Sequence, residues 1–244
     1  ASLNRQIYSD EVGGKKANDL RDRRDLLVDE LSQLVNVRVN ESEDGKYRVS
    51  ISGVSIVDHI HVSEIKLKKD ENDPTKEIKI LWSNDSEVKL RTGELKGSLE
   101  LYNGNGENNK YRGIPYYQKR LDEFAKGFAK KFNDQHGKGY KLGGEKGGDF
   151  FVGLNNNSEN ITAATITLSN EILKDLKNIA AAGDKNGSEN DNRNLLELIN
   201  QREDRNFFDT GTSQGTPDDF IKSILSNLAV DSMQSQRMYS SQNI

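Results

Sequence analysis

The chain has 244 residues, of which 33% are hydrophobic and 30% charged, and it carries a net charge of -4. It contains no cysteine, which excludes disulfide frameworks, thiolate metal sites and cysteine nucleophiles. The acidic balance argues against nucleic-acid binding by the whole chain, and no apolar run approaches the roughly 20 residues that a membrane-spanning helix needs. Eight Phe and eight Tyr remain for cores, so we expect a folded, elongated protein with thin cores.

Both ends of the chain read as helical sequence without a start or a stop. Residues 1–12 predict a short helix, in which Leu3 and Ile7 form an apolar (i, i+4) pair. Residues 233–244 end in helix-compatible sequence with no cap, and no signal peptide opens the chain. We therefore expect a fragment of a longer protein.

An amphipathic helix that passes directly into a strand is predicted for residues 17–39. Its leucines recur at spacings of seven, four and three, which places them on one helical face. Val35, Val37 and Val39 then alternate with polar residues, so the period changes from 3.6 to 2. The leucines of this face are Leu20, Leu27, Leu31 and Leu34.

Alternating apolar residues continue through residues 36–91 and predict a small, mostly antiparallel sheet with one apolar face. Asp44-Gly45 between two such runs is a strong hairpin signal. Residues 70–75 are predicted to form a polar loop, and the alternation resumes from Ile78 to Leu90.

Residues 92–137 are predicted to be helical, with Thr92 as a cap and Pro115 at the start of the second helix. The second helix carries the most regular apolar stripe of the chain. An aromatic stripe invites a cofactor hypothesis, but packing against a core is the better interpretation. The stripe consists of Tyr117, Leu121, Phe124, Phe128 and Phe132.

A glycine-rich loop is predicted for residues 133–160, followed by a strand and a short helix over residues 161–176. The glycines from Gly143 to Gly148 suggest a phosphate cradle only weakly, because the Gly-Lys-Ser/Thr ending of a P-loop is absent. We instead expect a structured loop that is anchored by Phe150 and Phe151.

Two more helices are predicted near the end of the chain. Residues 194–201 carry Leu and Ile at helical spacing, and Phe207-Phe208 should anchor the loop that follows. Thr216-Pro217 has the features of a helix start, with a threonine cap and proline at the first position. Beyond Val230 this last helix becomes polar, so we expect it to need a partner helix.

Candidate chemistry is sparse. His59 and His61 lie two residues apart in a predicted strand, beside Asp58, and would point to one face as zinc ligands can. No His-Glu-x-x-His motif and no nucleophile elbow accompany them. We therefore predict no catalytic, cofactor-binding or metal-binding residues and no enzyme activity.

Residues 110–141 are locally basic, with nine Lys and Arg against three acids. One interpretation is a surface for an anionic partner. The alternative is a solvated helix face, which we favour because acidic residues are interleaved with the basic ones.

Several stretches, in this order along the chain, resemble the flagellar hook-associated protein 1 family. The first is a glycine turn, an Ala-Asn-Asp-Leu run and an Arg-Asp pair, found here as Gly13-Gly14, Ala17-Asn18-Asp19-Leu20 and Arg24-Asp25. The second is a pair of helix starts, Thr92-Gly93-Glu94-Leu95-Lys96-Gly97 and Arg112 with Ile114-Pro115 and Leu121-Asp122. The most specific is an Asn-x-x-His block followed by Gly-Gly-Asp-Phe-Phe. Here that block reads Asn133, His136, Gly137, Gly144 and Gly148-Asp149-Phe150-Phe151.

The resemblance implies a structural subunit of the bacterial flagellum that joins the hook to the filament. It also implies export through the flagellar export apparatus to an extracellular location. The implied partners are hook protein, hook-associated protein 3 and an export chaperone, with self-association in the full-length assembly. By the same resemblance, we expect the family's N- and C-terminal tube-forming segments to lie outside this sequence.

Together these observations predict an α+β fold. We expect a discontinuous helical domain of long amphipathic helices at residues 1–35 and 92–244, with a small β-rich insertion at residues 36–91. Alternatives from other classes are another axial flagellar protein, of hook or filament type, and a surface adhesin or enzyme with an outer β domain. An enzyme would need a convergent polar pocket, most plausibly around Asp58, His59 and His61.

Overall fold

The computed structural model describes residues 1–14, 16–69, 77–108, 110–187, 189–208 and 215–242. Among these residues it contains seven α-helices and eight short strands, and every strand pair is antiparallel. The predicted α+β class is therefore confirmed. The chain divides into two compact units, residues 1–115 and 116–244, and each is described separately.

The first unit combines three helices with six strands. The helices are α1 (Ser2–Glu11), α2 (Asn18–Leu34) and α3 (Glu94–Asn103). The strands are β1 (Val37–Glu41), β2 (Tyr47–Ile51), β3 (Val54–Asp58), β4 (His61–Val62), β5 (Ile65–Lys68) and β6 (Lys79–Trp82).

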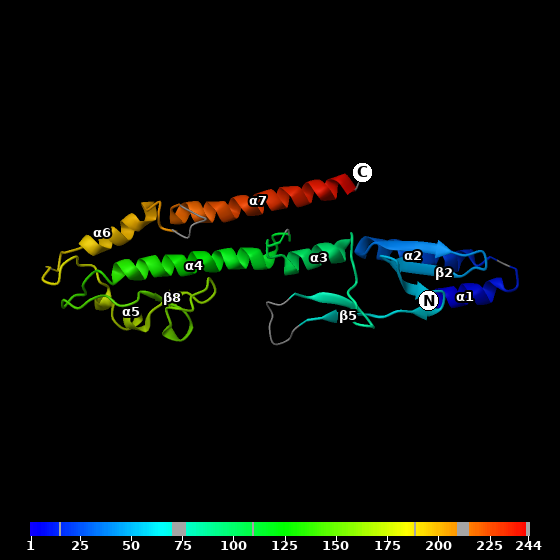
Figure 1. The fold of residues 1–244 in the computed structure, drawn as a ribbon, viewed down its shortest axis with the longest axis horizontal. Helices are drawn as coiled ribbons and strands as arrows, with labels where there is room; N and C mark the ends of the chain where they lie inside the picture. Colours follow the sequence, from blue (N-terminus) through cyan, green and yellow to red (C-terminus); the bar gives the residue numbers. More distant parts are fainter. Residues whose placement is uncertain (15, 70–76, 109, 188, 209–214, 243–244) are drawn as a thin grey trace. The chain divides into compact units, whose positions relative to one another are not determined.

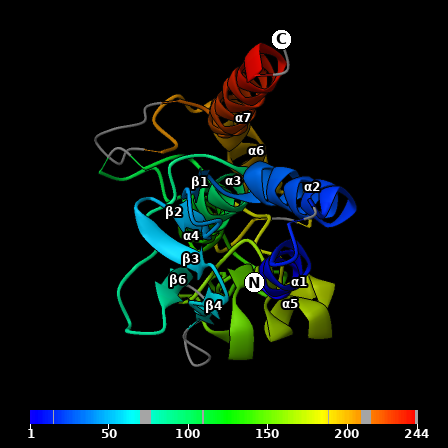
Figure 2. The ribbon, with the colours of Figure 1, turned by 90° about the vertical axis from the view of Figure 1, so that its right-hand side faces the viewer.

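The strands of the first unit form two sheets rather than the single sheet that we predicted. One has the order β1-β2-β3-β4, which Figure 2 shows in that sequence, and the other contains only β5 and β6. The predicted hairpin at Asp44-Gly45 is confirmed, and Gly45 has a φ of 76°, in the left-handed region that glycine adopts without strain. A second tight turn between β2 and β3 places Ser52 and Gly53 at positive φ.

The core of the first unit lies where α2 ends and the two sheets and α3 meet. Alternate residues of β6 contribute to it because a strand sends every second side chain to the same face, and β2 contributes its last residue. Leu95 and Leu99 of α3 pack against its edge. Its buried members are Val35, Ile51, Ile80, Trp82 and Val88.

The second unit is built around one long helix, α4 (Ile114–His136), whose first two residues belong to the first unit. Figure 1 shows α6 and α7 along one side of α4 and α5 and β8 along the other. The other elements are β7 (Phe151–Val152), β8 (Thr167–Leu168), α5 (Asn170–Lys174), α6 (Arg193–Asn200) and α7 (Pro217–Gln242). Three 3-10 turns, at Leu154–Asn156, Leu176–Asn178 and Gln201–Glu203, connect them.

The local predictions had mixed outcomes. The Thr216 cap is confirmed, because its Oγ1 accepts a hydrogen bond from the Asp219 N–H at 3.1 Å. The Thr92 cap is wrong: Gly93 occupies the cap position without any side-chain bond. The strand expected from residue 161 is reduced to Thr167–Leu168. The predicted polar loop at residues 70–75 lies outside the described residues.

The predicted domain division, with residues 36–91 inserted into a discontinuous helical domain, stays a prediction. Within the first unit, α2 and α3 share a core with strands of that segment. Among the described residues, no helix is both long and apolar enough to cross a lipid bilayer.

Candidate functional site

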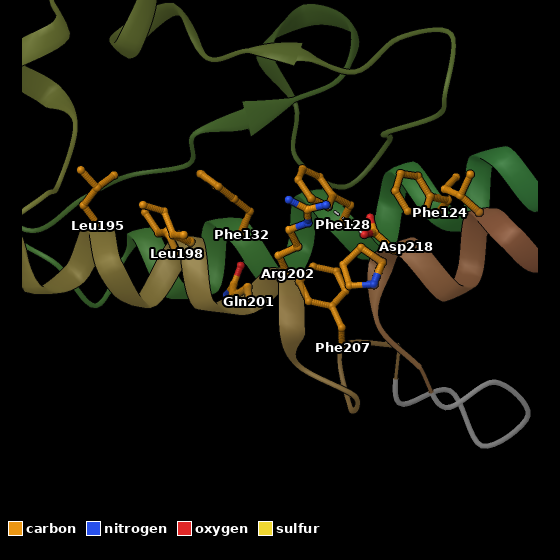
Figure 3. Close-up of a pocket in the computed structure, with 12 residues that line it drawn as sticks. Phe124, Phe128, Phe132, Leu195, Leu198, Gln201, Arg202, Phe207 and Asp218 are labelled. Atoms are coloured by element: carbon orange, nitrogen blue, oxygen red, sulfur yellow. Dashed lines mark hydrogen bonds and ion pairs between the residues drawn. The ribbon is translucent and has the colours of Figure 1, made fainter.

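An apolar groove in the second unit lies between α4, α6 and the start of α7 (Figure 3). Its volume is about 510 Å³. Its lining is almost entirely apolar, and only Gln201, Arg202 and Asp218 contribute polar groups. The apolar lining residues are Phe124, Phe128, Phe132, Leu195, Leu198, Ile199, Phe207, Pro217 and Ile221.

The α4 wall of the groove is the aromatic stripe predicted from the sequence. Phe124, Phe128 and Phe132 recur every four residues, so their rings stack along one face, with centroids 5.9 and 6.0 Å apart. Figure 3 shows these rings in a row along α4. The predicted packing role of the stripe is confirmed for these phenylalanines, whereas Leu121 remains exposed.

Phe207 lines the groove, and its neighbour Phe208 belongs to the same aromatic cluster; both are buried. Phe207 lies 5.9 Å from the Phe128 ring, and Phe208 lies 5.6 Å from the Phe124 ring, measured between centroids. Gly127 makes this approach possible, because a Cβ at that position would lie 2.6 Å from the Phe208 ring. The predicted anchoring role of the two phenylalanines is confirmed.

The mouth of the groove is open on the α6 side. Ile199 is 60% exposed and Leu195 is 40% exposed, although both are large apolar residues. The two charged lining residues pair with each other, since Arg202 Nη2 lies 3.2 Å from Asp218 Oδ2. The lining therefore supplies no unpaired charge and no nucleophile, and what it can do is accept apolar side chains.

Helix α7 is fixed on α4 at both the start and the middle of its length. The Thr216 hydroxyl and N–H both donate to the Asp219 carboxylate, and these bonds hold the pKa of Asp219 below its usual range. Farther along, the Tyr117 hydroxyl donates to Asp231 at 2.6 Å, and the Arg120 guanidinium lies over the Phe220 ring. The contacts of Tyr117 and Arg120 hold α7 on α4 beside the groove, whereas the Thr216–Asp219 bonds are internal to α7.

A second feature of this unit is a clamp, in which His136 forms hydrogen bonds with two distant backbone groups, at Gly148 and Ala180. His136 is fully buried at the end of α4. Its Nε2 accepts a hydrogen bond from the Ala180 N–H at 2.9 Å, so Nδ1 must carry the proton and donate to the Gly148 carbonyl at 2.7 Å. Burial, assisted by Lys141, lowers the pKa of His136, although the Gly148 bond opposes this shift.

Asn133 lies one helical turn before His136 and clamps the same loop. Its Oδ1 accepts hydrogen bonds from the N–H groups of Phe150 and Phe151 at 2.9 and 2.8 Å, and its Nδ2 donates to the Phe151 carbonyl at 2.7 Å. Gly147 must be glycine, because a Cβ there would lie 2.4 Å from the His136 carbonyl oxygen. Asn133 and His136 thus organise the loop that contains the Gly-Gly-Asp-Phe-Phe block.

The glycines proposed as a weak phosphate cradle take part in this folded loop instead. The Gly144 N–H donates to Lys141 O at 3.0 Å, and the Gly147 N–H donates to Gly139 O at 3.2 Å. Those two amides are therefore engaged within the chain and cannot cradle a phosphate.

Sequence reasoning missed Asn194, which ties the clamp to α6. Its Oδ1 accepts a hydrogen bond from Gln135 Nε2 at 2.8 Å, and its Nδ2 donates to the Ala180 carbonyl at 2.7 Å. Asn194 is buried, and the only sequence signal is its position at the start of a predicted helix. Nothing in the local pattern indicates its partners.

In the first unit, the corresponding fastening is a network of charged side chains on α2. Arg24 is only 7% exposed, and its guanidinium lies 3.5 Å from the centre of the Tyr47 ring on β2. Arg24 and Arg21 both pair with Glu41 of β1, at 3.3 and 2.9 Å. Arg21 also binds Glu11 at 2.7 Å and lowers the pKa of that carboxyl to about 2.

The structure does not assemble the candidate site at Asp58, His59 and His61. His59 lies in the turn between β3 and β4 with a φ of 55°, not in a strand, and its carbonyl accepts a hydrogen bond from Asn4 at 2.7 Å. Asp58 pairs with Arg48 at 3.1 Å, while His61 is exposed. Across the described parts of the chain, no group of three or more His, Asp or Glu is arranged to hold a metal ion.

At least three of the nine basic side chains in residues 110–141 form ion pairs with acidic side chains. Arg120 pairs with Glu123 at 2.7 Å and Lys141 with Glu171 at 2.7 Å, and Lys110 pairs with Glu77. This pairing favours a solvated face over a surface for an anionic partner.

The sequence of residues 1–151 matches the family described as the flagellar hook-associated protein FlgK helical domain. Flagellar hook-associated protein 1 of Bacillus subtilis is 31% identical over 223 residues, covering 82% of this chain and 43% of the relative. The protein of the same name from Salmonella typhimurium is 31% identical over 161 residues, covering 62% of this chain and 28% of the relative.

A solved structure of the flagellar hook junction protein FlgK from Burkholderia pseudomallei is 27% identical, with a TM-score of 0.48. The match covers 62% of this chain and 27% of that chain. The chain thus spans less than half the length of the curated relatives that it matches. Because the family match extends over more than half of its residues, the chain belongs to the flagellar hook-associated protein FlgK helical-domain family.

Proposed function

We propose that this chain is part of a structural subunit of the bacterial flagellum that joins the hook to the filament and has no catalytic activity. The observation that carries the proposal is the family match over residues 1–151. That stretch includes α4 and its clamp residues Asn133 and His136. The names of the curated relatives, each a flagellar hook-associated protein 1, support the same role.

The physical character of the second unit supports a structural role. Its main groove offers apolar side chains and one internal ion pair, which suits packing against another protein surface rather than bond breaking. Two of the buried polar side chains in this unit, His136 and Asn194, form hydrogen bonds with backbone groups. This arrangement supports a structural role for the unit.

The proposal extends to location and partners. As part of the flagellum, the protein would be exported through the flagellar export apparatus and act outside the cell. Its partners would be hook protein, hook-associated protein 3, an export chaperone and further copies of itself in the full-length assembly. These partners are proposed from family membership alone, because this chain covers less than half of the length of its relatives.

Deletion of the gene, with rescue by the full-length protein, tests the proposal. We expect deleted cells to retain hooks but to lose hook-attached filaments, and rescue to restore both filaments and swimming. Electron microscopy of the cell surface distinguishes the outcomes. Filaments that remain attached to hooks after deletion would contradict the junction role.

The role of the groove can be tested with a matched pair of variants in the full-length protein. Ile199→Asp places a charge at the groove mouth, where the native side chain is 60% exposed, so the fold should tolerate it. Leu173→Asp is the control, because Leu173 is 63% exposed on α5, outside the groove lining. We expect only Ile199→Asp to reduce filament attachment. Equal effects of both variants would show that the groove has no specific role in the attachment.

A further inference from the structure

The chain contains three Asn-Gly sequences, Asn103-Gly104, Asn105-Gly106 and Asn186-Gly187. Asn-Gly is the sequence most prone to spontaneous deamidation, because glycine has no side chain to hinder its backbone nitrogen. That nitrogen loses its proton and attacks the asparagine Cγ, the bond from Cγ to the side-chain nitrogen breaks, and the departing nitrogen takes up a proton and leaves as ammonia. Water then opens the resulting succinimide to aspartate or isoaspartate. The reaction requires a free carboxamide and a backbone able to bend over it.

Both polar atoms of the Asn103 carboxamide are hydrogen-bonded, which hinders this reaction. Its Oδ1 accepts a hydrogen bond from the Ile78 N–H at 2.9 Å, and its Nδ2 donates to the Ile78 carbonyl at 2.8 Å. The following Gly104 is tightly enclosed, since a Cβ there would lie 2.5 Å from both the Glu100 and the Tyr111 carbonyl oxygens. Neither the side chain nor the backbone can turn without breaking these contacts.

Asn105 is held less firmly. Its Oδ1 accepts a hydrogen bond from the Glu107 N–H at 3.0 Å. The nucleophile that deamidation needs, the Gly106 nitrogen, donates to the Tyr111 carbonyl at 3.1 Å, beside the β-bridge between Asn105 and Arg112. Both bonds must open before the ring can close.

Asn186 differs from the other two in its side chain. It is exposed, and its carboxamide has no hydrogen-bond partner among the residues that the structure describes. The Gly187 N–H makes one turn bond, to the Asp184 carbonyl at 3.1 Å, and Gly187 is exposed as well. The Asn186 N–H also donates to the Asp184 carboxylate at 3.0 Å, and Gly187 approaches Asp191 closely, since a Cβ there would lie 2.4 Å from Asp191 Oδ2. The turn is therefore held by its backbone, whereas the carboxamide of Asn186 is not held by any described residue.

We propose that Asn186 is the principal deamidation site of this protein, with Asn105 slower and Asn103 the slowest. Each hydrogen bond that must open first slows the reaction by roughly fivefold to tenfold. The product adds a carboxylate to a loop that already contains Asp184 and Asp191, and Asp191 fastens that loop through the N–H groups of Gly183 and Asp184. The modification therefore increases the negative charge of this loop.

Peptide mass spectrometry after incubation of the folded protein in mildly alkaline buffer tests this order. We expect the acidic product to accumulate first at Asn186, roughly fivefold to tenfold faster than at Asn105. In denaturant the three sites should converge, because all three are Asn-Gly and only the fold separates them. Equal rates at Asn103 or Asn105 and Asn186 in the folded protein would overturn the proposal.

The variant Asn186→Gln provides an independent check. Glutamine would have to close a six-membered ring, which forms more slowly, and an exposed side chain without a partner can be replaced without loss of structure. We expect the variant to lose most of the acidic species seen by charge-separating chromatography while its circular dichroism is unchanged. Persistence of those species at the wild-type rate would place the main site elsewhere and contradict the assignment.

Discussion

The two units of the chain hold their long helices in different ways. In the first unit, α2 is fastened to the sheet by charged side chains, above all Arg24 on the Tyr47 ring and its pairing with Glu41. In the second unit, α4 is fastened by stacked phenylalanine rings and by two side chains, Asn133 and His136, that bond to backbone groups.

From this difference we expect salt and acid to affect the stability of the two units differently. Partly exposed ion pairs weaken as salt screens them, and they contribute little individually. Aromatic packing and buried hydrogen bonds to the backbone do not depend on salt in that way, but a buried neutral histidine makes the fold sensitive to acid. Substitutions in each unit test this contrast, and the largest loss of stability is expected in the second unit.

Phe207→Ala should cause the largest loss of stability, about 3 to 5 kcal/mol, in the second unit. Phe207 is almost completely buried, and its loss leaves a cavity beneath the Phe128 ring. Chemical denaturation followed by helical circular dichroism measures the change. The exposed Leu176→Ala in the same unit is the control, and similar effects of the two variants would show that the aromatic cluster does not hold α4.

Asn133→Ala should destabilise the second unit by about 2 to 4 kcal/mol, because it leaves two N–H groups and one carbonyl without their partner. Amide hydrogen exchange at Phe150 and Phe151 should speed up more than exchange elsewhere. The exposed Asn190→Ala serves as the control. Unchanged protection of both phenylalanine amides would contradict the clamp.

Acid should weaken the second unit through His136. Its pKa is lowered in the folded protein, so the unfolded chain takes up the proton first as the pH falls below about 6.5. Each unit of pKa difference removes about 1.4 kcal/mol of stability, whereas above this range the contribution is fully present.

The control for this effect is His136→Gln, whose amide can donate to Gly148 and accept from Ala180 without titrating. The two proteins differ only at residue 136, so the difference between the two pH profiles isolates His136. Parallel profiles of denaturation midpoint against pH would show that the clamp is not the acid-sensitive element.

Arg24→Lys should have the smallest effect, a loss of about 1 kcal/mol from the first unit, because an ammonium cannot stack on Tyr47 as a guanidinium does. Trp82 is the single tryptophan and is buried in the core of this unit, so its fluorescence reports the change. Arg48→Lys, at an exposed pair with Asp58, is the control and should change little. Equal losses would contradict the importance of the Arg24 contact.

Local patterns predicted much of the fold. The change of period after Leu34, the Asp44-Gly45 hairpin, the α4 stripe and the Thr216 start were confirmed, since each depends on neighbours a few residues apart. The Thr92 cap failed for a tertiary reason. Gly93 lies against the end of α2, where a Cβ would be 2.5 Å from Leu34 O, and no local rule contains that contact.

The functional surfaces were predicted less completely. The phenylalanine stripe was evident, but the face of α2 that is buried was not. There the structure buries Arg24 and exposes Leu27 and Leu34, because Tyr47 offers a ring to a cation. The hydrogen-bond partners of Asn194 and His136 lie between 12 and 59 residues away in sequence, and residue spacing alone gives no information about them.

Helix α4 carries large rings on one side and, around the helix from them, the small Ala125 and Ala129 with the clamp residues. One inserted residue within this helix would rotate everything after it by about 100°, bringing rings where methyl groups fit and methyl groups where rings are needed. The packing on both sides of the helix would be lost together. The length of α4 is therefore fixed by its own geometry, and we expect related sequences to vary in length in their loops and never inside this helix.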